Sequence, residues 1–411
     1  MRLIRITTNH LSYINNFYAF RPELKQQTYT VQYQELMADC FGWADFWTHA
    51  FRKLGYEVWE PVGNAESMQK VWAQENGISY EEKTWLTDII TAQINHFQPD
   101  IVFVNDYSTY TLEFFRHIRS ECPSIKLVMG WCGAPYLDGS IFNAYDVVLS
   151  NIPSLVDNFR KSGHRCEYMC HAFEPRILDK INLKSSQKAA FSFVGSLIKG
   201  EGFHNQREEL LKYLIQETEL EIWSDARQVS AKEKLLLPLK KQVYNWIKTA
   251  KFMPGFNSLI TSFPKLNAYA NMEKCPDLSQ YIAPILASRL QPALFGLSMY
   301  QKLYDSLVTL NNHIDIASQF ASNMRLYEAT GVGTCLLTEW QYNLHEVFEP
   351  DVEVVTYRSP AEAVEKVRYL LSNDEARCKI AASGQRRTLQ NHTFDLRAQQ
   401  LDRLIQDRIK L

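Results

Sequence analysis

The sequence predicts an α/β protein with two doubly wound domains that face each other across a cleft. Three observations indicate this. Short apolar runs alternate with helical stretches over roughly the first 170 residues, a polar stretch at Leu178–Lys188 has no apolar period, and the alternation then begins again at Phe191. Strands that alternate with helices are typical of parallel sheets covered by helices on both faces. A chain of 411 residues also exceeds what one hydrophobic core usually serves.

The first predicted domain covers residues 1–177. Its apolar runs predict strands at Leu3–Thr7, Glu57–Pro61, Ile101–Asn105, Lys126–Trp131, Val147–Ser150 and Glu167–Cys170. Amphipathic stretches between them predict helices at Trp43–Leu54, Glu81–His96, Thr111–Glu121 and Ser154–Ser162. The first ten residues lack the long apolar region of a signal peptide, so we expect them to supply the first strand.

A polar linker at 178–188 leads to the second predicted domain, residues 189–393. Strands are predicted at Phe191–Val194, Leu220–Trp223, Leu307–Asn311, Cys335–Leu337 and Glu353–Thr356. Helical stretches are predicted at Asn205–Glu217, Met299–Ser306, Arg325–Gly331, Pro360–Ser372 and Asp374–Gln390. A C-terminal helix over residues 394–411 can pack back on the first domain.

Residues 225–297 depart from this alternation and predict a mostly helical insertion. Its segment Lys232–Lys251 mixes three leucines at 235–237 and Trp246 with several lysines. A basic amphipathic helix of this kind can lie on an anionic membrane surface. A helix packed on its own domain explains the same residues, and it is the interpretation that we favour.

Composition and spacing exclude several classes of protein. The net charge of −2 gives the chain no electrostatic reason to bind DNA or RNA. No apolar run reaches the ~18 residues of a membrane-spanning helix. The eight cysteines contain no CxxC pair, which predicts a reduced, cytoplasmic protein without a zinc site. His, Asp and Glu likewise lack the spacing of a metal site, so we expect no metal.

Aromatic residues gather in the first third of the chain. We expect most of them in the hydrophobic core, although aromatic faces also form platforms for sugar rings. The members are Tyr13, Phe17, Tyr18, Phe20, Phe41, Trp43, Phe46 and Trp47.

The most informative segment is Asn323–Gly333. Arg325 and Glu328 lie three residues apart and therefore share one face of a helix. A helix entrance with these groups suits a nucleotide, because backbone N–H groups and arginine bind phosphate while a carboxylate binds ribose hydroxyls. Asn323 is placed to cap this helix. The alternative is a local ion pair worth only ~0.3–0.5 kcal/mol, and the surrounding α/β pattern leads us to favour the nucleotide site.

Other loops that follow strands of the second domain should converge on this site, since ligands bind at the carboxyl ends of parallel strands. The loop Gly195–Gly200 begins with Gly195 and Ser196, whose backbone can approach a phosphate closely. Arg207, on the next helix, is a candidate contact to a phosphate or hydroxyl group. A surface arginine beside a helix cap is the alternative for Arg207.

Two more strand ends carry candidate ligands. Trp223 ends its strand and can stack on a base, although a core tryptophan is the more common use of such a residue. Polar residues crowd the strand end at 311–315, where Asn311 and His313 are candidate donor-site residues.

The pattern Asn323-x-Arg325-x-x-Glu328-Ala329-x-x-x-Gly333 resembles the C-terminal domain of glycosyltransferases with the GT-B fold of two Rossmann-like domains. It is especially similar to the CgeB-like family of spore maturation proteins, with a glycosyltransferase family 1-like C-terminal domain. The likeness is strong from about residue 295 to 401 and looser over Phe191–Arg207.

This resemblance implies that the second domain binds a nucleoside diphosphate sugar. Glu328 would then bind the ribose hydroxyls, and Arg325 with the Gly195–Ser196 loop would meet the diphosphate. One departure concerns Phe320: many retaining relatives carry two glutamates eight positions apart, and Phe320 stands at the partner position of Glu328. The stereochemistry of transfer is therefore left open.

Candidates for a general base follow strands of the first domain. Asp106 and His10 each come directly after a predicted strand, and either side chain can remove a proton from an acceptor hydroxyl. A structural carboxylate or histidine at a strand end explains each of them equally well, and we rank Asp106 above His10. His171 can line the cleft or merely pack there.

The sequence thus predicts a metal-independent glycosyltransferase of the hexosyltransferase type that uses a nucleoside diphosphate sugar and no cofactor. The acceptor hydroxyl would belong to a glycan, a lipid-linked glycan, a small molecule or a protein, in polysaccharide or glycoconjugate biosynthesis. A nucleotide-sugar epimerase or hydrolase on the same fold and a non-catalytic assembly protein are the alternatives. We expect a cytoplasmic protein, with peripheral membrane contact as an open alternative.

Overall fold

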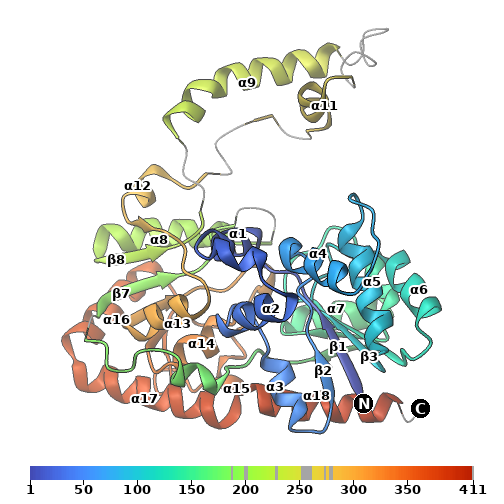
Figure 1. Ribbon diagram of the computed structural model, residues 1–411. Coiled ribbons are helices and arrows are strands. Elements are labelled where there is room, and N and C mark those ends of the chain that lie inside the picture. Colours follow the sequence, from blue (N-terminus) through green and yellow to red (C-terminus); the bar gives the residue numbers. More distant parts are fainter. Residues whose placement is uncertain are drawn as a thin grey trace.

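The computed structural model contains two six-stranded sheets, and neighbouring strands in each sheet are parallel (Figure 1). The structure describes residues 1–186, 188–198, 202–226, 230–250, 262–272, 275–276 and 281–409. Lys199 and Gly200 of the predicted loop, Lys251 of the predicted helix and parts of the predicted insertion lie outside the described residues.

The N-terminal part of the chain forms the first sheet. Its strands are β1 (Arg2–Ile6), β2 (Glu57–Trp59), β3 (Ile101–Val104), β4 (Leu127–Trp131), β5 (Val147–Ser150) and β6 (Cys166–Tyr168). Their order across the sheet is β2-β1-β3-β4-β5-β6. The helices of this part are α1 (Leu11–Ala19), α2 (Tyr29–Ala38), α3 (Phe46–Arg52), α4 (Glu66–Glu75), α5 (Trp85–Phe97), α6 (Leu112–Glu121) and α7 (Pro153–Lys161).

The second sheet follows the same plan. Its strands are β7 (Ala189–Val194), β8 (Leu220–Trp223), β9 (Leu290–Gln291), β10 (Ser306–Asn311), β11 (Cys335–Glu339) and β12 (Val355–Tyr357), in the order β12-β11-β10-β7-β8-β9. The helices are α8 (Asn205–Glu217), α9 (Ala231–Ala250), α11 (Pro264–Asn271), α12 (Pro284–Ala287), α13 (Gly296–Tyr304), α14 (Arg325–Gly331), α15 (Leu344–Val347), α16 (Pro360–Ser372), α17 (Asp374–Asn391) and α18 (Phe394–Ile409).

Successive side chains along each strand of the first sheet point to opposite faces, and both faces are buried. Phe103 and Met129 pack in the same hydrophobic cluster as α3 and α18, whereas the neighbouring Val102 and Val128 pack with α6 and α7. A parallel sheet covered on both faces has strands that are continuous apolar runs. This is why the strands of the first sheet could be recognised in the sequence.

The last helix returns to the first sheet (Figure 1). Lys53 Nζ lies 2.7 Å from Asp395 Oδ2, and the Tyr56 hydroxyl donates to Asp402 Oδ1 at 2.5 Å. A second link between the two halves joins Asn151 Nδ2 to the backbone oxygen of Ser322 at 2.7 Å. Polar and apolar contacts therefore hold the two sheets in one arrangement.

Some elements differ from the sequence prediction. Helices α1, α2 and α4 were not predicted, because α1, for example, is rich in aromatic residues and asparagine, which are weak helix formers. Burial of Tyr13, Ile14, Phe17 and Tyr18 on one side of α1 outweighs this low propensity. The edge strand β9 was also missed, since two residues give no recognisable pattern.

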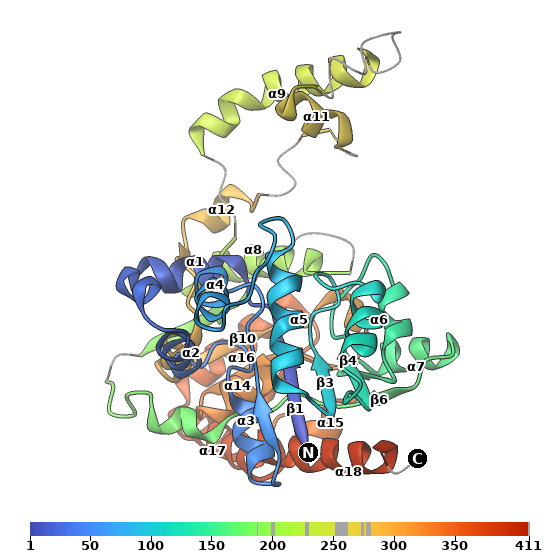
Figure 2. The same cartoon turned by 45° about the vertical axis from the view of Figure 1, so that its right-hand side comes forward.

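The predicted insertion contains α9 and α11, which pack on each other. The favoured interpretation of a helix packed on its domain is wrong for α9: its buried Ile247 lies against Ala270 and Leu266 of α11. Figures 1 and 2 show this pair projecting from the rest of the molecule. Among the described helices, none combines the length and the apolar character that a membrane-spanning segment needs.

Candidate functional site

A cavity of about 560 Å³ lies between the carboxyl ends of the two sheets. Its wall is formed by loops that follow β1, β3, β4 and β5 in the first sheet and β7, β8 and β10 in the second, together with α14. Parallel α/β sheets bind ligands at this edge. The cavity brings together nine of the predicted site residues: His10, Gly195, Ser196, Arg207, Trp223, Asn311, Asn323, Arg325 and Glu328.

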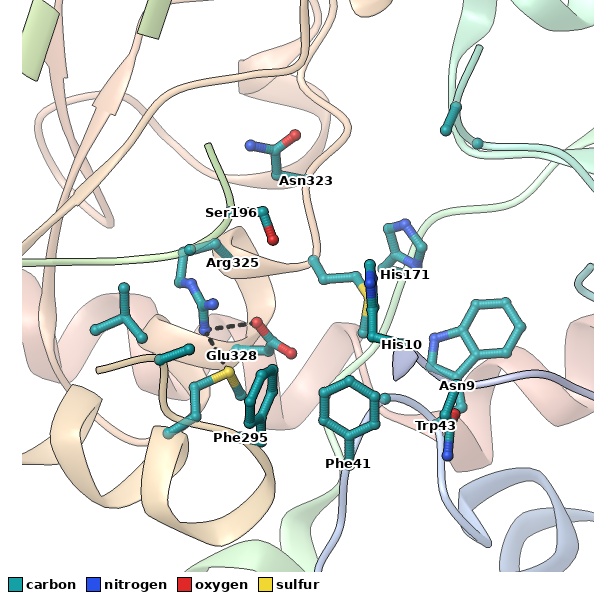
Figure 3. Close-up of a pocket in the computed structure, with 18 of the residues that line it drawn as sticks. Asn9, His10, Phe41, Trp43, His171, Ser196, Phe295, Asn323, Arg325 and Glu328 are labelled. Atoms are coloured by element: carbon teal, nitrogen blue, oxygen red, sulfur yellow. Dashed lines mark hydrogen bonds and ion pairs between the residues drawn. The ribbon is translucent and has the colours of Figure 1, made fainter. Parts of the chain in front are cut away.

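Arg325 and Glu328 form an ion pair in the cavity wall, with Arg325 Nη1 2.7 Å from Glu328 Oε2 (Figure 3). Their side chains are only 14% and 7% exposed, so water screens this pair less than it screens a surface pair. The Tyr300 hydroxyl also donates to Glu328 Oε1 at 3.4 Å. Burial and the nearby Glu328 carboxylate raise the pKa of Tyr300 well above its ordinary value, so Tyr300 stays a donor. The two interpretations of the motif are therefore compatible: the ion pair exists, and both partners line the cavity.

The start of α14 is arranged differently from the sequence prediction. Met324 precedes the helix without a side-chain capping bond, and Asn323 does not cap it. Instead, Asn323 Nδ2 donates to Asn311 Oδ1 at 3.0 Å and to the backbone oxygen of Asn312 at 2.7 Å. The amides of residues 326–328 donate to the backbone oxygens of residues 323 and 324. Because these three amides already donate hydrogen bonds within the protein, a phosphate at this site would be bound mainly by side chains.

Arg207 is buried and holds two loops together. Nη1 donates to the backbone oxygen of Ser196 at 2.7 Å, and Nη2 donates to that of Asn312 at 2.6 Å. Burial lowers the pKa of Arg207 to about 10, so the guanidinium is still charged at neutral pH. The alternative of a surface arginine is wrong. Arg207 lies at the cavity and ties the loop after β7 to the loop after β10.

The loop after β7 packs against the end of β8. The Gly195 amide donates to the Trp223 backbone oxygen at 3.1 Å, and a Cβ on Gly195 would lie 3.1 Å from the Phe193 ring. Trp223 is buried, with Lys302 Nζ 4.3 Å from its ring centroid, and it also lines the cavity. The Gly195 amide is therefore already used in a hydrogen bond within the protein. The neighbouring Ser196 lines the cavity.

Asp106 and His313 are the predicted site residues that are absent from the described wall of the cavity. Asp106 Oδ1 accepts hydrogen bonds from the amides of Ser108 and Thr109, and Oδ2 accepts one from the Thr8 hydroxyl. Burial raises the pKa of Asp106, but these hydrogen bonds outweigh that effect and lower it below its ordinary value. His313 is buried, and burial followed by the charge of Arg207 lowers its pKa to about 3. Both side chains have the surroundings of structural groups.

The opposite wall comes from the first sheet. Asn9 and His10 follow β1, and Figure 3 shows them across the cavity from Arg325 and Glu328. The His10 ring is exposed and lies 6.4 Å from the ring of Phe41. This places an accessible imidazole opposite the ion pair.

Two aromatic residues that the sequence did not assign to the site also line it. Phe41 stacks on Tyr13 with ring centroids 3.8 Å apart, and it meets Phe295 edge-on at 5.5 Å. The aromatic enrichment of the first third was a signal for Phe41, whereas nothing in the sequence indicated its pairing with Phe295. Both residues are partly exposed, so their rings offer an apolar surface to a ligand.

Three polar atoms of cavity-lining residues have no hydrogen-bond partner among the described residues. These are His171 Nδ1, Asn151 Oδ1 and Ser322 Oγ. Burial, with a smaller effect of Arg397, lowers the pKa of His171 to about 3, so its ring is neutral. Buried polar groups usually have partners, but these three atoms are closed off from solvent and do not open onto the cavity. Within the described part of the chain, no group of three or more His, Cys, Asp or Glu side chains is arranged to hold a metal ion.

The last third of the chain matches a known protein family. Residues 272–403 match the family model described as "Glycosyl transferase-like". This region contains Asn323, Arg325 and Glu328, which form one wall of the cavity. The chain therefore carries a glycosyl transferase-like domain over these residues.

Solved structures with the same two-sheet plan align with almost the whole chain. A glycosyltransferase from Rickettsia africae ESF-5 has 10% identity and a TM-score of 0.52, covering 100% of this chain and 98% of its own. Anabaena HepE, solved with UDP and glucose, has 10% identity and a TM-score of 0.53, covering 99% and 100%. The chain has the GT-B fold. Sucrose-phosphate synthase from Thermosynechococcus elongatus is also similar, at 8% identity with a TM-score of 0.50 and coverage of 99% and 98%.

Identities this low show the GT-B fold and not the activity. No protein of curated function matches the chain in sequence. The chemistry must therefore be argued from the GT-B cavity itself.

Proposed function

We propose that the protein is a glycosyltransferase that moves a sugar from a nucleoside diphosphate sugar to an acceptor hydroxyl. One observation carries this proposal: Arg325 and Glu328 line the wall of a cavity between two sheets, within the glycosyl transferase-like region, opposite the accessible His10. A cation and a carboxylate on one wall suit a diphosphate and a ribose. An imidazole on the other wall suits the activation of a hydroxyl group.

The donor would bind along the second sheet. Glu328 would accept hydrogen bonds from the ribose hydroxyls, and Arg325 with the Ser196 hydroxyl would bind the diphosphate. Trp223, at the end of β8, offers an aromatic surface for the base. We assign Arg207, Asn311 and Asn323 a positioning role, because their side chains hold the loops after β7 and β10 in place.

The acceptor would enter from the first sheet. We assign the general base to His10 rather than Asp106, because His10 is exposed at the cavity and Asp106 is held among structural hydrogen bonds. As the acceptor oxygen attacks the anomeric carbon, its proton passes to His10. The bond between that carbon and the phosphate oxygen breaks, and its electron pair leaves with the nucleoside diphosphate. Arg325 would stabilise the negative charge on the leaving group.

We further propose that the transfer inverts the anomeric centre and needs no metal or cofactor. Phe320, at the position of the second glutamate of retaining relatives, is absent from the described cavity wall.

The motif around Glu328 supports a CgeB-like hexosyltransferase. The scattered free cysteines support a cytoplasmic location. We retain the proposed domain limits of 1–177 and 189–393, which place one sheet in each domain.

The test is release of nucleoside diphosphate from a panel of UDP-, GDP-, ADP- and dTDP-sugars, with and without a mixture of oligosaccharide acceptors. One donor should be consumed faster when acceptors are present. His10→Gln should slow this turnover by about 100-fold or more while donor binding is retained. His117→Gln, a change at an exposed histidine on α6, is the matched control. Turnover of His10→Gln equal to that of the control would remove His10 from the mechanism.

A further inference from the structure

The helical pair α9 and α11 forms no part of the described cavity wall. Figures 1 and 2 show it projecting beyond α12, away from both sheets. Its two helices share a small core in which Ile247 and Ala270 are buried, with Leu266 packed against them. The pair is therefore a separate projection whose outer surface the proposed transfer reaction does not use.

One side of α9 exposes large apolar side chains. Leu235 is 79% exposed, Leu239 is 56% exposed and Trp246 is 53% exposed. At about 100° per residue, these three positions fall within roughly 40° of one another around the helix. Ile247 and Val243, which pack towards α11, lie on an adjacent side. The exposed residues therefore form a ridge distinct from the face that α11 already covers.

The same segment is strongly basic. Residues 230–250 and 262–272 contain six lysines and one glutamate, a net charge of +5, whereas the whole chain carries −2. Lys232 and Lys241 are exposed on α9. At the same 100° per residue, Lys232 lies about 20° from Leu239 around the helix, whereas Lys241 lies on the far side. The ridge thus belongs to a segment that is positively charged as a whole.

We propose that the ridge of Leu235, Leu239 and Trp246 docks on a membrane surface that contains anionic lipid. Leucine side chains gain free energy only where water is removed, and tryptophan favours the boundary between headgroups and acyl chains. Lys232 beside the ridge would meet lipid phosphates, and the other lysines of the segment would add to the attraction by the anionic surface. An apolar ridge on a helix whose other sides carry lysines is the arrangement with which helices lie in the plane of an anionic bilayer surface.

The experiment is co-sedimentation of the full-length protein with phosphatidylcholine vesicles, with and without phosphatidylglycerol, at low and high salt. Binding should require phosphatidylglycerol and weaken at high salt. The double variant Leu235→Ser/Leu239→Ser should bind about tenfold more weakly. Leu183→Ser is the matched control, since Leu183 is 47% exposed in the connection between the two sheets. Because all three leucines are exposed, thermal unfolding of each variant should match that of the native protein.

Three results would overturn the proposal. The first is no binding to anionic vesicles, and the second is equal binding to neutral ones. The third is anionic-vesicle binding that the double serine variant does not change. Concentration-dependent self-association that the same variant abolishes, without vesicle binding, would assign the ridge to a second copy of the chain instead. None of these readouts depends on glycosyl transfer.

Discussion

Glu328→Gln removes the charge from the residue on which the proposed donor site depends and keeps its size. In the structure the carboxylate is 7% exposed, with Arg325 at 2.7 Å and the Tyr300 hydroxyl at 3.4 Å. The substitution therefore does two things at once. It removes the proposed ribose acceptor, and it leaves the Arg325 guanidinium without its carboxylate.

The lost ribose contact is measured as weaker nucleotide binding, and the lost ion pair is measured as a lower free energy of unfolding. A hydrogen bond to a charged group contributes ~1.5–3 kcal/mol, so loss of the ribose contact should weaken nucleotide binding about 10- to 150-fold. Loss of the shielded ion pair should also lower the free energy of unfolding by about 1–3 kcal/mol. Arg325→Gln breaks the same pair from the other side and is the matched variant.

Isothermal titration with three related ligands separates these contributions. Against the preferred nucleoside diphosphate, both variants should bind more weakly. Against its 2′,3′-dideoxy analogue, the loss caused by Glu328→Gln should largely vanish, because the hydroxyl partners are gone. Against the free nucleoside, Arg325→Gln should bind almost normally. If both variants lose stability but bind all three ligands like the native protein, the pair is only structural and our assignment is wrong.

Three further predictions concern structural roles. Asp106→Asn should lower the free energy of unfolding by about 1–3 kcal/mol in urea titrations and leave donor binding unchanged; normal stability with turnover reduced 100-fold would restore Asp106 as the base. Arg207→Met should cost about 2–5 kcal/mol in the same assay, because buried carbonyl groups of two loops lose their donor; a change below ~1 kcal/mol would contradict its role. Burial lowers the pKa of His313 to about 3 and that of His392 to about 4. The unfolded chain then binds more protons below pH ~6.5, so each histidine should reduce stability by up to ~1.4 kcal/mol per pH unit as pH falls towards these values. His313→Gln should flatten that slope in thermal unfolding between pH 7 and 5, and an unchanged slope would contradict this assignment.

The fold could be predicted because it repeats one local pattern, a short apolar strand followed by a helix. Strands such as β3 are short apolar runs, since a parallel sheet buried on both faces leaves few polar positions. The position of the cavity followed from the same pattern, because ligands bind at the carboxyl ends of such strands. Residues of α14 could be assigned to the site for this reason.

The roles of individual side chains could not be read in the same way. Asp106 and His10 both follow strands, yet the turn at Ser108 and Thr109 draws the Asp106 carboxylate into local hydrogen bonds. The direction of a side chain after a strand depends on that turn, which the apolar pattern does not encode.

Contacts across the cleft could not be predicted from the sequence either. Phe41 and Phe295 lie far apart in the chain and meet only because the two sheets face each other. The link between Asn151 and Ser322 has the same origin. Nothing in either segment alone indicates its partner.

The most direct test of the central claim is a thermal-shift panel of UDP, GDP, ADP and dTDP. The cavity with Arg325 and Glu328 in its wall should bind at least one of them. At 100 times its Kd a nucleotide adds ~2.7 kcal/mol of stability, which should raise the unfolding temperature by about 3 °C for a chain of 411 residues that unfolds as one unit. The rise should shrink in both Glu328→Gln and Arg325→Gln. No rise with any of the four nucleotides at millimolar concentration would contradict the account of a nucleotide-sugar site.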